Sequence, residues 1–293
     1  MKILTIKHTT IYRYANPVTL GDHRLMLRPR DSHDMRLIAT RLEINPRPAS
    51  LRWQFDVFGN SVAIASFGQM TNLLRFESEI QLEHFEQGTP DCPIEAYAEM
   101  FPFSYSADEV PDVIRYIERH YADPRREVDQ WARDFQNENG RSHTLEMLTA
   151  MTQATKAQGF GYIAREAEGV QTPIETLHKR SGTCRDFALL MMEGARALGL
   201  AARFVSGYLY TPPAGGRNQV GGGATHAWVQ IYLPGAGWVE FDPTNGIVGT
   251  RDLVRVAIVR DPAQAIPIAG SWNGAATDFL GMTVEVATTS EIR

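Results

Sequence analysis

One segment of the chain, residues 184–198, constrains the fold more than any other. It contains the unbroken apolar stretch Leu189–Met192 and stops at Gly199, a common residue just beyond a helix. A helix with so little polar surface is buried in a folded protein. Segments with strand character follow it at residues 201–210, 224–233 and 237–241. The pattern therefore predicts one buried helix followed directly by β-strands.

The first 90 residues have a different pattern, in which apolar and polar positions alternate as in strands with one exposed face. Between residues 72 and 84, one parity is largely apolar and the other is charged or polar. Residues 56–60 are predicted as a turn between strands at 51–55 and 61–67, because a Gly-Asn pair tolerates left-handed backbone angles. These residues predict an antiparallel β-domain.

Helical spacing of apolar residues appears only after this region. It recurs at residues 108–121, 125–137 and 145–157, so most of the segment 93–158 is predicted to be helical. In the tail, residues 253–259 and 282–288 are predicted as strands, with an irregular connection at 261–273.

Composition argues against several classes of protein. The 293 residues carry a formal net charge of −5 with an isoelectric point near 5.9, unlike a protein that binds nucleic acid by bulk electrostatics. No apolar run reaches transmembrane length, and the N-terminus lacks the apolar stretch of a signal peptide. Two isolated cysteines, Cys92 and Cys184, form neither a disulfide framework nor a zinc site. We expect a cytoplasmic protein without metal, cofactor, nucleic-acid or membrane partner.

Cys184 is the first candidate for chemistry, because it opens the apolar helix. A thiol in the first turn of a helix faces unpaired backbone amides and the positive end of the helix dipole, which favour thiolate over thiol. The preceding Gly182 allows a close approach of backbone, and the amide of Cys184 is placed to donate to a developing oxyanion. The alternative is a small buried core residue, which is the commoner fate of a free cysteine.

His226 and Asp242 are the next candidates, on two strands joined by a tight Pro234-Gly235 turn. If residues 233 and 237 flank the turn, paired positions have numbers that sum to about 470. His226 then faces position 244, and Asp242 is its same-face diagonal neighbour, at a backbone spacing of roughly 7–8 Å that two side chains bridge. The alternatives are a satisfied strand histidine and an aspartate that ends its strand in an Asp-Pro turn.

Taken together, these motifs resemble the transglutaminase-like superfamily of papain-type cysteine enzymes. The matching segments are Gly182–Ala188, Ala201–Tyr208, His226–Val229 and Gly237–Asn245, and residues such as His8–Tyr14 and Asp56–Asn60 resemble the N-terminal β-domain of bacterial members. The resemblance implies an α+β fold: an N-terminal antiparallel β-domain at 1–92, then a papain-like transglutaminase core at 93–293, with the cysteine helix packed on the histidine and aspartate sheet. It also implies a triad of Cys184 as nucleophile, His226 as base and acid, and Asp242 as orienter.

The implied reaction is attack of the Cys184 thiolate on an amide carbonyl of a peptide or protein substrate, giving a thioester. Water then gives hydrolysis, which we expect, and an amine gives transamidation, the runner-up. A non-catalytic binding module and acyl transfer from a small thioester donor to an arylamine are further alternatives.

Several other residues are weaker candidates. The aromatic residues Phe160, Tyr162, Tyr208 and Trp228 are candidates for an acyl-binding cleft, with ordinary core packing as the alternative. Asp186 is a candidate to orient the first turn of its helix. The glycine-rich loop 211–223 is a candidate lid or a plain hairpin loop.

Overall fold

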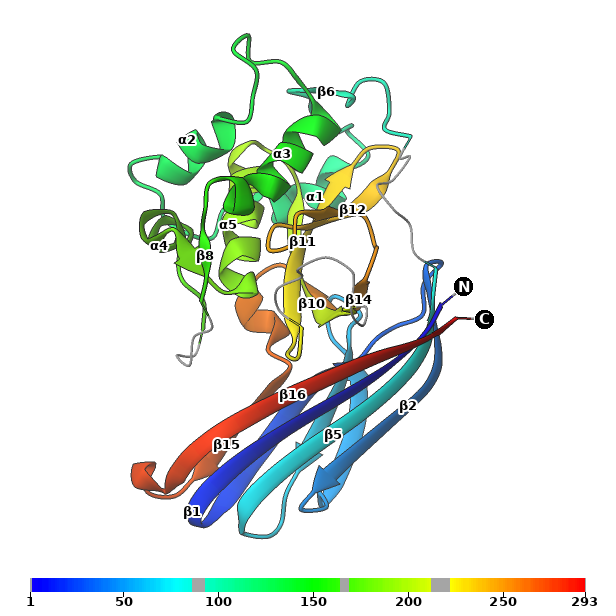
Figure 1. Ribbon diagram of the computed structural model, residues 1–293, viewed down its shortest axis with the longest axis vertical. Coiled ribbons are helices and arrows are strands. Elements are labelled where there is room, and N and C mark those ends of the chain that lie inside the picture. Colours follow the sequence, from blue (N-terminus) through cyan, green and yellow to red (C-terminus); the bar gives the residue numbers. More distant parts are fainter. Residues whose placement is uncertain (1, 86–92, 164–168, 212–221, 293) are drawn as a thin grey trace.

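The computed structural model describes residues 2–85, 93–163, 169–211 and 222–292. These residues form a long, curved sheet assembly below and a helix-covered smaller sheet above it (Figure 1). Among the described residues, no helix is long and apolar enough to cross a membrane.

The lower assembly is built around one 27-residue strand, β1 (Lys2–Arg28). The first half of β1 pairs with two strands and the second half with two others, and all pairings are antiparallel. The seven strands are β1, β2 (Met35–Asn45), β3 (Ser50–Phe55), β4 (Ser61–Ser66), β5 (Thr71–His84), β15 (Ile268–Asn273) and β16 (Phe279–Ile292). The predicted antiparallel β-domain is confirmed, as are the β3–β4 hairpin and the single buried face of β5, with Leu74 and Leu82 fully buried.

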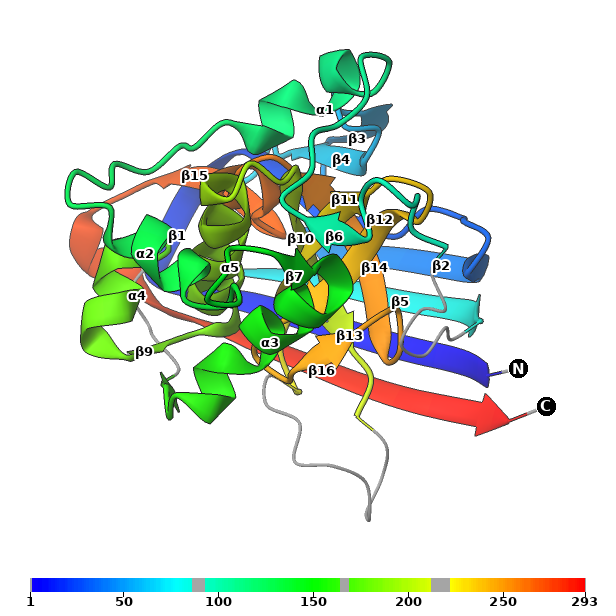
Figure 2. The same ribbon diagram turned by 90° about the horizontal axis from the view of Figure 1, so that it is seen from above.

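The end of the chain contributes to this same assembly. Strand β16 pairs with β1 from Lys2↔Ile292 to Tyr14↔Phe279, and the two ends of the chain lie side by side (Figures 1 and 2). The segment 261–273 was predicted as irregular, but it contains the short helix η1 (Pro262–Ala265) and the strand β15. Residues 268–273 form a strand because they pair with the second half of β1. The domain boundaries 1–92 and 93–293 stay a prediction, but β15 and β16 pair with the strand that opens the first of these ranges.

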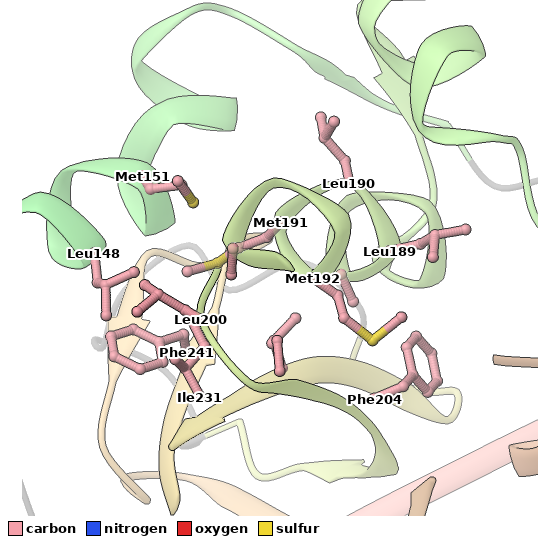
Figure 3. Close-up of a cluster of buried hydrophobic side chains, with 14 of the residues drawn as sticks. Leu148, Met151, Leu189, Leu190, Met191, Met192, Leu200, Phe204, Ile231 and Phe241 are labelled. Carbon is pink, nitrogen blue, oxygen red and sulfur yellow. The ribbon is translucent and has the colours of Figure 1, made fainter. Parts of the chain in front are cut away.

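The upper half contains the predicted buried helix, α5 (Cys184–Ala197), against an antiparallel five-stranded sheet. Its strand order is β13-β12-β11-β10-β14, and the bounds are β10 (Ala202–Leu209), β11 (His226–Leu233), β12 (Gly237–Asp242), β13 (Ile247–Val248) and β14 (Leu253–Val259). Side chains of α5 meet the sheet in an apolar core that contains Met191, Met192 and Phe241, and Met192 lies near Phe204 (Figure 3).

Shorter elements complete this half. The helices α1 (Val110–Ile117), α2 (Glu127–Arg133) and α3 (Thr144–Ala157) fall within or close to the three predicted helical segments. Each of the first two is shorter than its apolar pattern suggested, because α1 ends at an extended Glu118 and α2 begins after a left-handed Arg126. The remaining elements are α4 (Pro173–Lys179), β6 (Met100–Phe101), β7 (Ser142–His143), β8 (Gly161–Tyr162), β9 (Ser181–Gly182) and η2 (Ala276–Asp278).

The two halves share a buried interface between β1 and β5 below and β10 and β14 above. Its apolar part is one cluster formed by Leu4, Ile6, Met35, Ile80, Leu82, Tyr208, Tyr210, Val254 and Val256. Polar bonds cross it as well: the Asn60 amide donates to the Ile258 carbonyl (2.8 Å) and accepts from the Ile258 N–H (2.9 Å). A side-chain amide therefore extends the backbone ladder of β14 toward the lower assembly.

Candidate active site

Cys184 is the first residue of α5, as the sequence predicted, and its side chain is 5% exposed. Asp186, on the same first turn, is fully buried and accepts from the Thr183 backbone N–H (2.8 Å) and hydroxyl (2.9 Å). It also accepts from the backbone N–H of Gln171 (2.7 Å). Asp186 therefore ties the first turn of α5 to two residues that precede the thiol, Gln171 and Thr183, which supports its candidacy as the residue that orients this turn.

Gly182 lies where only a hydrogen side chain fits. A Cβ atom built there would lie 2.8 Å from the Cβ of Asp186 and 2.9 Å from Nε2 of Gln171, closer than real Cβ contacts. The strand β9 that holds Gly182 pairs in parallel with β8, so that Tyr162 lies beside Gly182. The glycine that precedes the nucleophile thus makes room for the residues that anchor the helix start.

The hairpin of β11 and β12 has the register that the turn predicted. Gln230 pairs with Glu240 and Leu233 with Gly237, so paired numbers sum to 470 throughout. His226 and Asp242 are accordingly diagonal neighbours at the open end of the hairpin. Nε2 of His226 lies 2.8 Å from Oδ2 of Asp242, and both side chains are fully buried.

Residues of the turn after β12 donate further hydrogen bonds to the Asp242 carboxylate. Oδ1 accepts from the backbone N–H of Thr244 (2.9 Å) and Asn245 (3.3 Å), while Oδ2 accepts from Nδ2 of Asn245 (2.9 Å). Helix α3 holds this turn from outside, since the Thr155 hydroxyl donates to the Pro243 carbonyl at 2.5 Å. Sequence reasoning missed Asn245 as a site residue; its position three residues after Asp242 was the available signal.

The structure also brings Cys184 to His226. Cys184 lies close enough to His226 to favour its imidazolium form. Since Nε2 is bonded to Asp242, Nδ1 is the ring nitrogen left for the thiol; it is buried and has no hydrogen-bond partner among the described residues. Burial acts to lower the pKa of His226, but the adjacent Asp242 carboxylate and then Cys184 outweigh it and raise this pKa to about 10. Burial acts to raise the pKa of Asp242, but His226, Asn245 and Thr244 outweigh it, so that this pKa is lowered. The pair is therefore a carboxylate and an imidazolium at neutral pH.

The four aromatic candidates are distributed differently from the prediction. Tyr162 is 38% exposed and interacts with the Cys184 side chain; burial, followed by Cys184, raises its pKa. Phe160 is half-buried near Phe187 and under Arg180. Tyr208 is buried at the interface between the two halves and bonds His8 (2.9 Å), so it does not line a cleft.

Trp228, the fourth aromatic candidate, is fully buried. Its ring stacks on His226 at 5.9 Å between centroids and 28° between planes. Trp228 therefore packs against the imidazole instead of lining an open cleft.

The candidate lid, loop 211–223, falls outside the part of the chain that the structure describes, except for its ends. So does Cys92, to which the sequence assigned no chemistry. Within the described residues, no three His, Cys, Asp or Glu side chains group as a metal site would require.

Known proteins resemble the chain in both of its halves. Residues 4–83 match the bacterial transglutaminase-like N-terminal region, and residues 129–243 match the transglutaminase-like superfamily. An uncharacterized protein of Mycobacterium tuberculosis is 30% identical over 289 residues, covering 90% of this chain and 86% of the relative.

Two further proteins resemble the chain, one over a short segment and one over nearly its whole length. The protein-glutamine gamma-glutamyltransferase of Pseudomonas aeruginosa is 33% identical over 111 residues, which is 36% of this chain and 16% of that protein. A Cytophaga hutchinsonii structure of a candidate cysteine protease shares the fold, with a TM-score of 0.69 at 18% identity over 98% of this chain and 90% of that one. The chain belongs to the transglutaminase-like superfamily, with the bacterial N-terminal region of that family at its start.

Proposed function

We propose that the protein is a cysteine-dependent hydrolase of amide bonds in peptides or proteins, acting through a thioester on Cys184. One observation carries the proposal: a thiol at a helix N-terminus, an imidazole and a carboxylate converge in that order, with the His226–Asp242 contact at 2.8 Å and fully buried. Such a nucleophile, base and orienting acid form the general arrangement of covalent acyl transfer.

The first half of the reaction forms the thioester. The Cys184 sulfur attacks the carbonyl carbon of the amide, and the carbonyl oxygen becomes an oxyanion, to which the Cys184 backbone N–H donates. His226, held as imidazolium by Asp242, transfers a proton to the nitrogen of the leaving amine. The C–N bond breaks, the amine leaves, and the acyl group remains on Cys184.

The second half releases the acyl group. Neutral His226 takes a proton from water, whose oxygen attacks the thioester carbonyl carbon. The C–S bond breaks, the carboxylic acid leaves, and the thiolate and imidazolium return. Asp242 stays ionised throughout, because four donors surround its two oxygens.

Transamidation is the second candidate, and the similarity to the Pseudomonas gamma-glutamyltransferase favours it. It uses the same thioester and replaces water by a primary amine. The two candidates therefore differ only in the acceptor that reaches the acyl group.

The test is to trap the thioester. The protein is mixed with a library of glutamine-containing peptides and quenched in acid, and intact mass and peptide mapping then locate the adduct. We expect acylation of Cys184 in the wild type and none in Cys184→Ala, with folding of both checked by circular dichroism.

The fate of the thioester then decides between the candidates. Hydrolysis converts peptides to acids in buffer alone, and transamidation attaches a fluorescent primary amine when this is added. Absence of any acyl adduct, with both proteins folded, would contradict the enzyme assignment and favour a binding module.

A further inference from the structure

A chain of buried charged and polar groups connects the lower assembly to the candidate active site. It begins at Asp34, which is 1% exposed and lies in the turn that leads into β2. The Asp34 carboxylate accepts from both terminal nitrogens of Arg255 on β14, at 2.9 and 2.5 Å. Ser32 donates to the same carboxylate at 2.6 Å. The lower assembly thus holds the guanidinium of Arg255 in one orientation through a bidentate hydrogen bond.

Arg255 connects Asp34 to the upper sheet through a second hydrogen bond. Its Nη1 atom also donates to Oε1 of Glu240 on β12, at 2.8 Å. Glu240 is 1% exposed and lies opposite Gln230 in the hairpin, whose amide donates to the same carboxylate at 2.7 Å. Its second oxygen accepts the indole N–H of Trp228. The single polar atom of the Trp228 ring is therefore held by Glu240.

Trp228 is the last member of the chain, because its ring lies on the face of the His226 imidazole. Asp242 holds the edge of that imidazole at Nε2, and the stacked indole fixes its plane. Rotation of the His226 ring away from Cys184 changes its stacking on the indole, and the indole is tied to Glu240. The direction in which Nδ1 points is thus set by contacts that begin at Asp34.

The apolar cluster at the interface also holds the two halves together, and apolar replacements of buried ion pairs are often equally stable or more stable. Buried charges such as these are instead suited to fixing one specific arrangement.

We propose that Asp34 is a positioning residue for His226, acting through Arg255, Glu240 and Trp228. The N-terminal β-domain is on this view a working part of the active site and not a separate module. The inference rests on the proposed function for its catalytic meaning, while its physical content, the orientation of Trp228 and His226, can be measured without turnover.

The decisive variant is Asp34→Asn, which keeps the shape of the side chain and removes its charge. Its matched control is Asp252→Asn, since Asp252 forms another ion pair between the two halves, with Lys2 at 3.4 Å. Both substitutions weaken the interface, but only Asp34 connects through Arg255 and Glu240 to Trp228.

The first readout is the indole N–H resonance of Trp228 in a ¹H–¹⁵N correlation spectrum, assigned with Trp228→Phe. We expect Asp34→Asn to shift this resonance and the ring resonances of His226, and Asp252→Asn to leave both in place. The second readout is the rate of alkylation of Cys184 by iodoacetamide. It should fall between about twofold and thirtyfold in Asp34→Asn only.

Two further variants complete the test. If Asp34→Asn does not fold, Ser32→Ala removes one donor to Asp34 and should shift the same resonances in the same direction by less. Glu240→Gln combined with Asp34→Asn should change the alkylation rate no more than the stronger single change does, because both act through one chain.

Three results would overturn the proposal. They are an unmoved Trp228 resonance in folded Asp34→Asn, equal shifts in Asp34→Asn and Asp252→Asn, or additive rate effects in the double variant. Failure of the proposed function would have another signature, an unreactive Cys184 in the wild type, and the Trp228 and His226 resonances would still test the positioning chain.

Discussion

Replacing Asp242 by asparagine tests the electrostatics of the candidate site most sharply. The carboxylate holds the pKa of His226 at about 10 against an ordinary 6.5, although burial acts in the opposite direction. A difference of this size corresponds to about 5 kcal/mol of preference for the imidazolium. Asparagine removes the carboxylate charge and keeps the burial, so that the pKa of His226 should fall well below about 10, with Cys184 alone left to oppose the effect of burial. The imidazolium of the variant should therefore lose its proton at a much lower pH than that of the wild type.

The assay is an NMR titration of the ¹³Cε1 resonance of His226, assigned with His226→Gln. In the wild type the resonance should stay at its imidazolium position from pH 5 to about 8.5, and in Asp242→Asn it should titrate at a clearly lower pH than in the wild type. Asp278→Asn is the matched control, because Asp278 is another buried aspartate and bonds Asn16 far from His226 in the sequence. A wild-type midpoint near 6.5, or the same curve in Asp242→Asn, would refute the reasoning.

Stability should follow the same charges. The raised pKa of His226 stabilises the fold fully below pH 6.5, and this contribution is lost as the pH rises through about 10. The lowered pKa of Asp242 adds a contribution that is present above pH 3.8 and lost in acid. The difference in unfolding free energy between wild type and Asp242→Asn should therefore be largest between pH 3.8 and 6.5.

Three further perturbations have defined outcomes. Gly182→Ala should slow alkylation of Cys184 and lower the unfolding free energy by about 1–3 kcal/mol, because the new Cβ lies 2.8 Å from Asp186. Gly161→Ala, with only a 3.8 Å contact in the paired strand, should be tolerated in the same two assays, and equal effects would contradict the steric argument. Met191→Ala should lower the unfolding free energy in urea by about 2–5 kcal/mol, because its side chain is fully buried; a change under 1 kcal/mol would show that the core in Figure 3 tolerates the loss. Asp34→Asn should lower the unfolding free energy by about 2 kcal/mol at pH 7, because Arg255 outweighs burial and lowers the pKa of Asp34 to about 2. This contribution to stability is present above pH 3.8 and is lost as the pH falls through about 2. Urea unfolding at pH 7 and near pH 2 checks this, and a pH-independent difference would contradict it.

The hairpin shows why part of the site was predictable from the sequence. A tight Pro234-Gly235 turn leaves one register for the strands on either side, so that counting outward from it placed Asp242 diagonal to His226. Likewise, the apolar run behind Cys184 allowed no other place for that helix than the center of a core. Local chain geometry is sufficient in both cases.

The elements that were not predicted depend on partners far away in the sequence. Strand β15 was interpreted as an irregular connection, since Ile268–Asn273 contains glycine and little alternation, and its pairing with β1 supplies what its own pattern lacks. Asp34 and Arg255 are 221 positions apart, and each alone is an ordinary charged residue. No local signal shows that a turn before β2 and a strand near the end of the chain share one buried ion pair.

Alkylation of Cys184 across pH tests the central claim most directly. The purified protein is treated with iodoacetamide, and peptide mapping separates Cys184 from Cys92. Because the proposed nucleophile is a thiolate beside an imidazolium, we expect fast labelling at or below neutral pH, much slower labelling in His226→Ala, and no change in His178→Ala, where the replaced histidine is exposed. Labelling of Cys184 that stays slow until about pH 8.5, or that requires denaturation, would contradict the account.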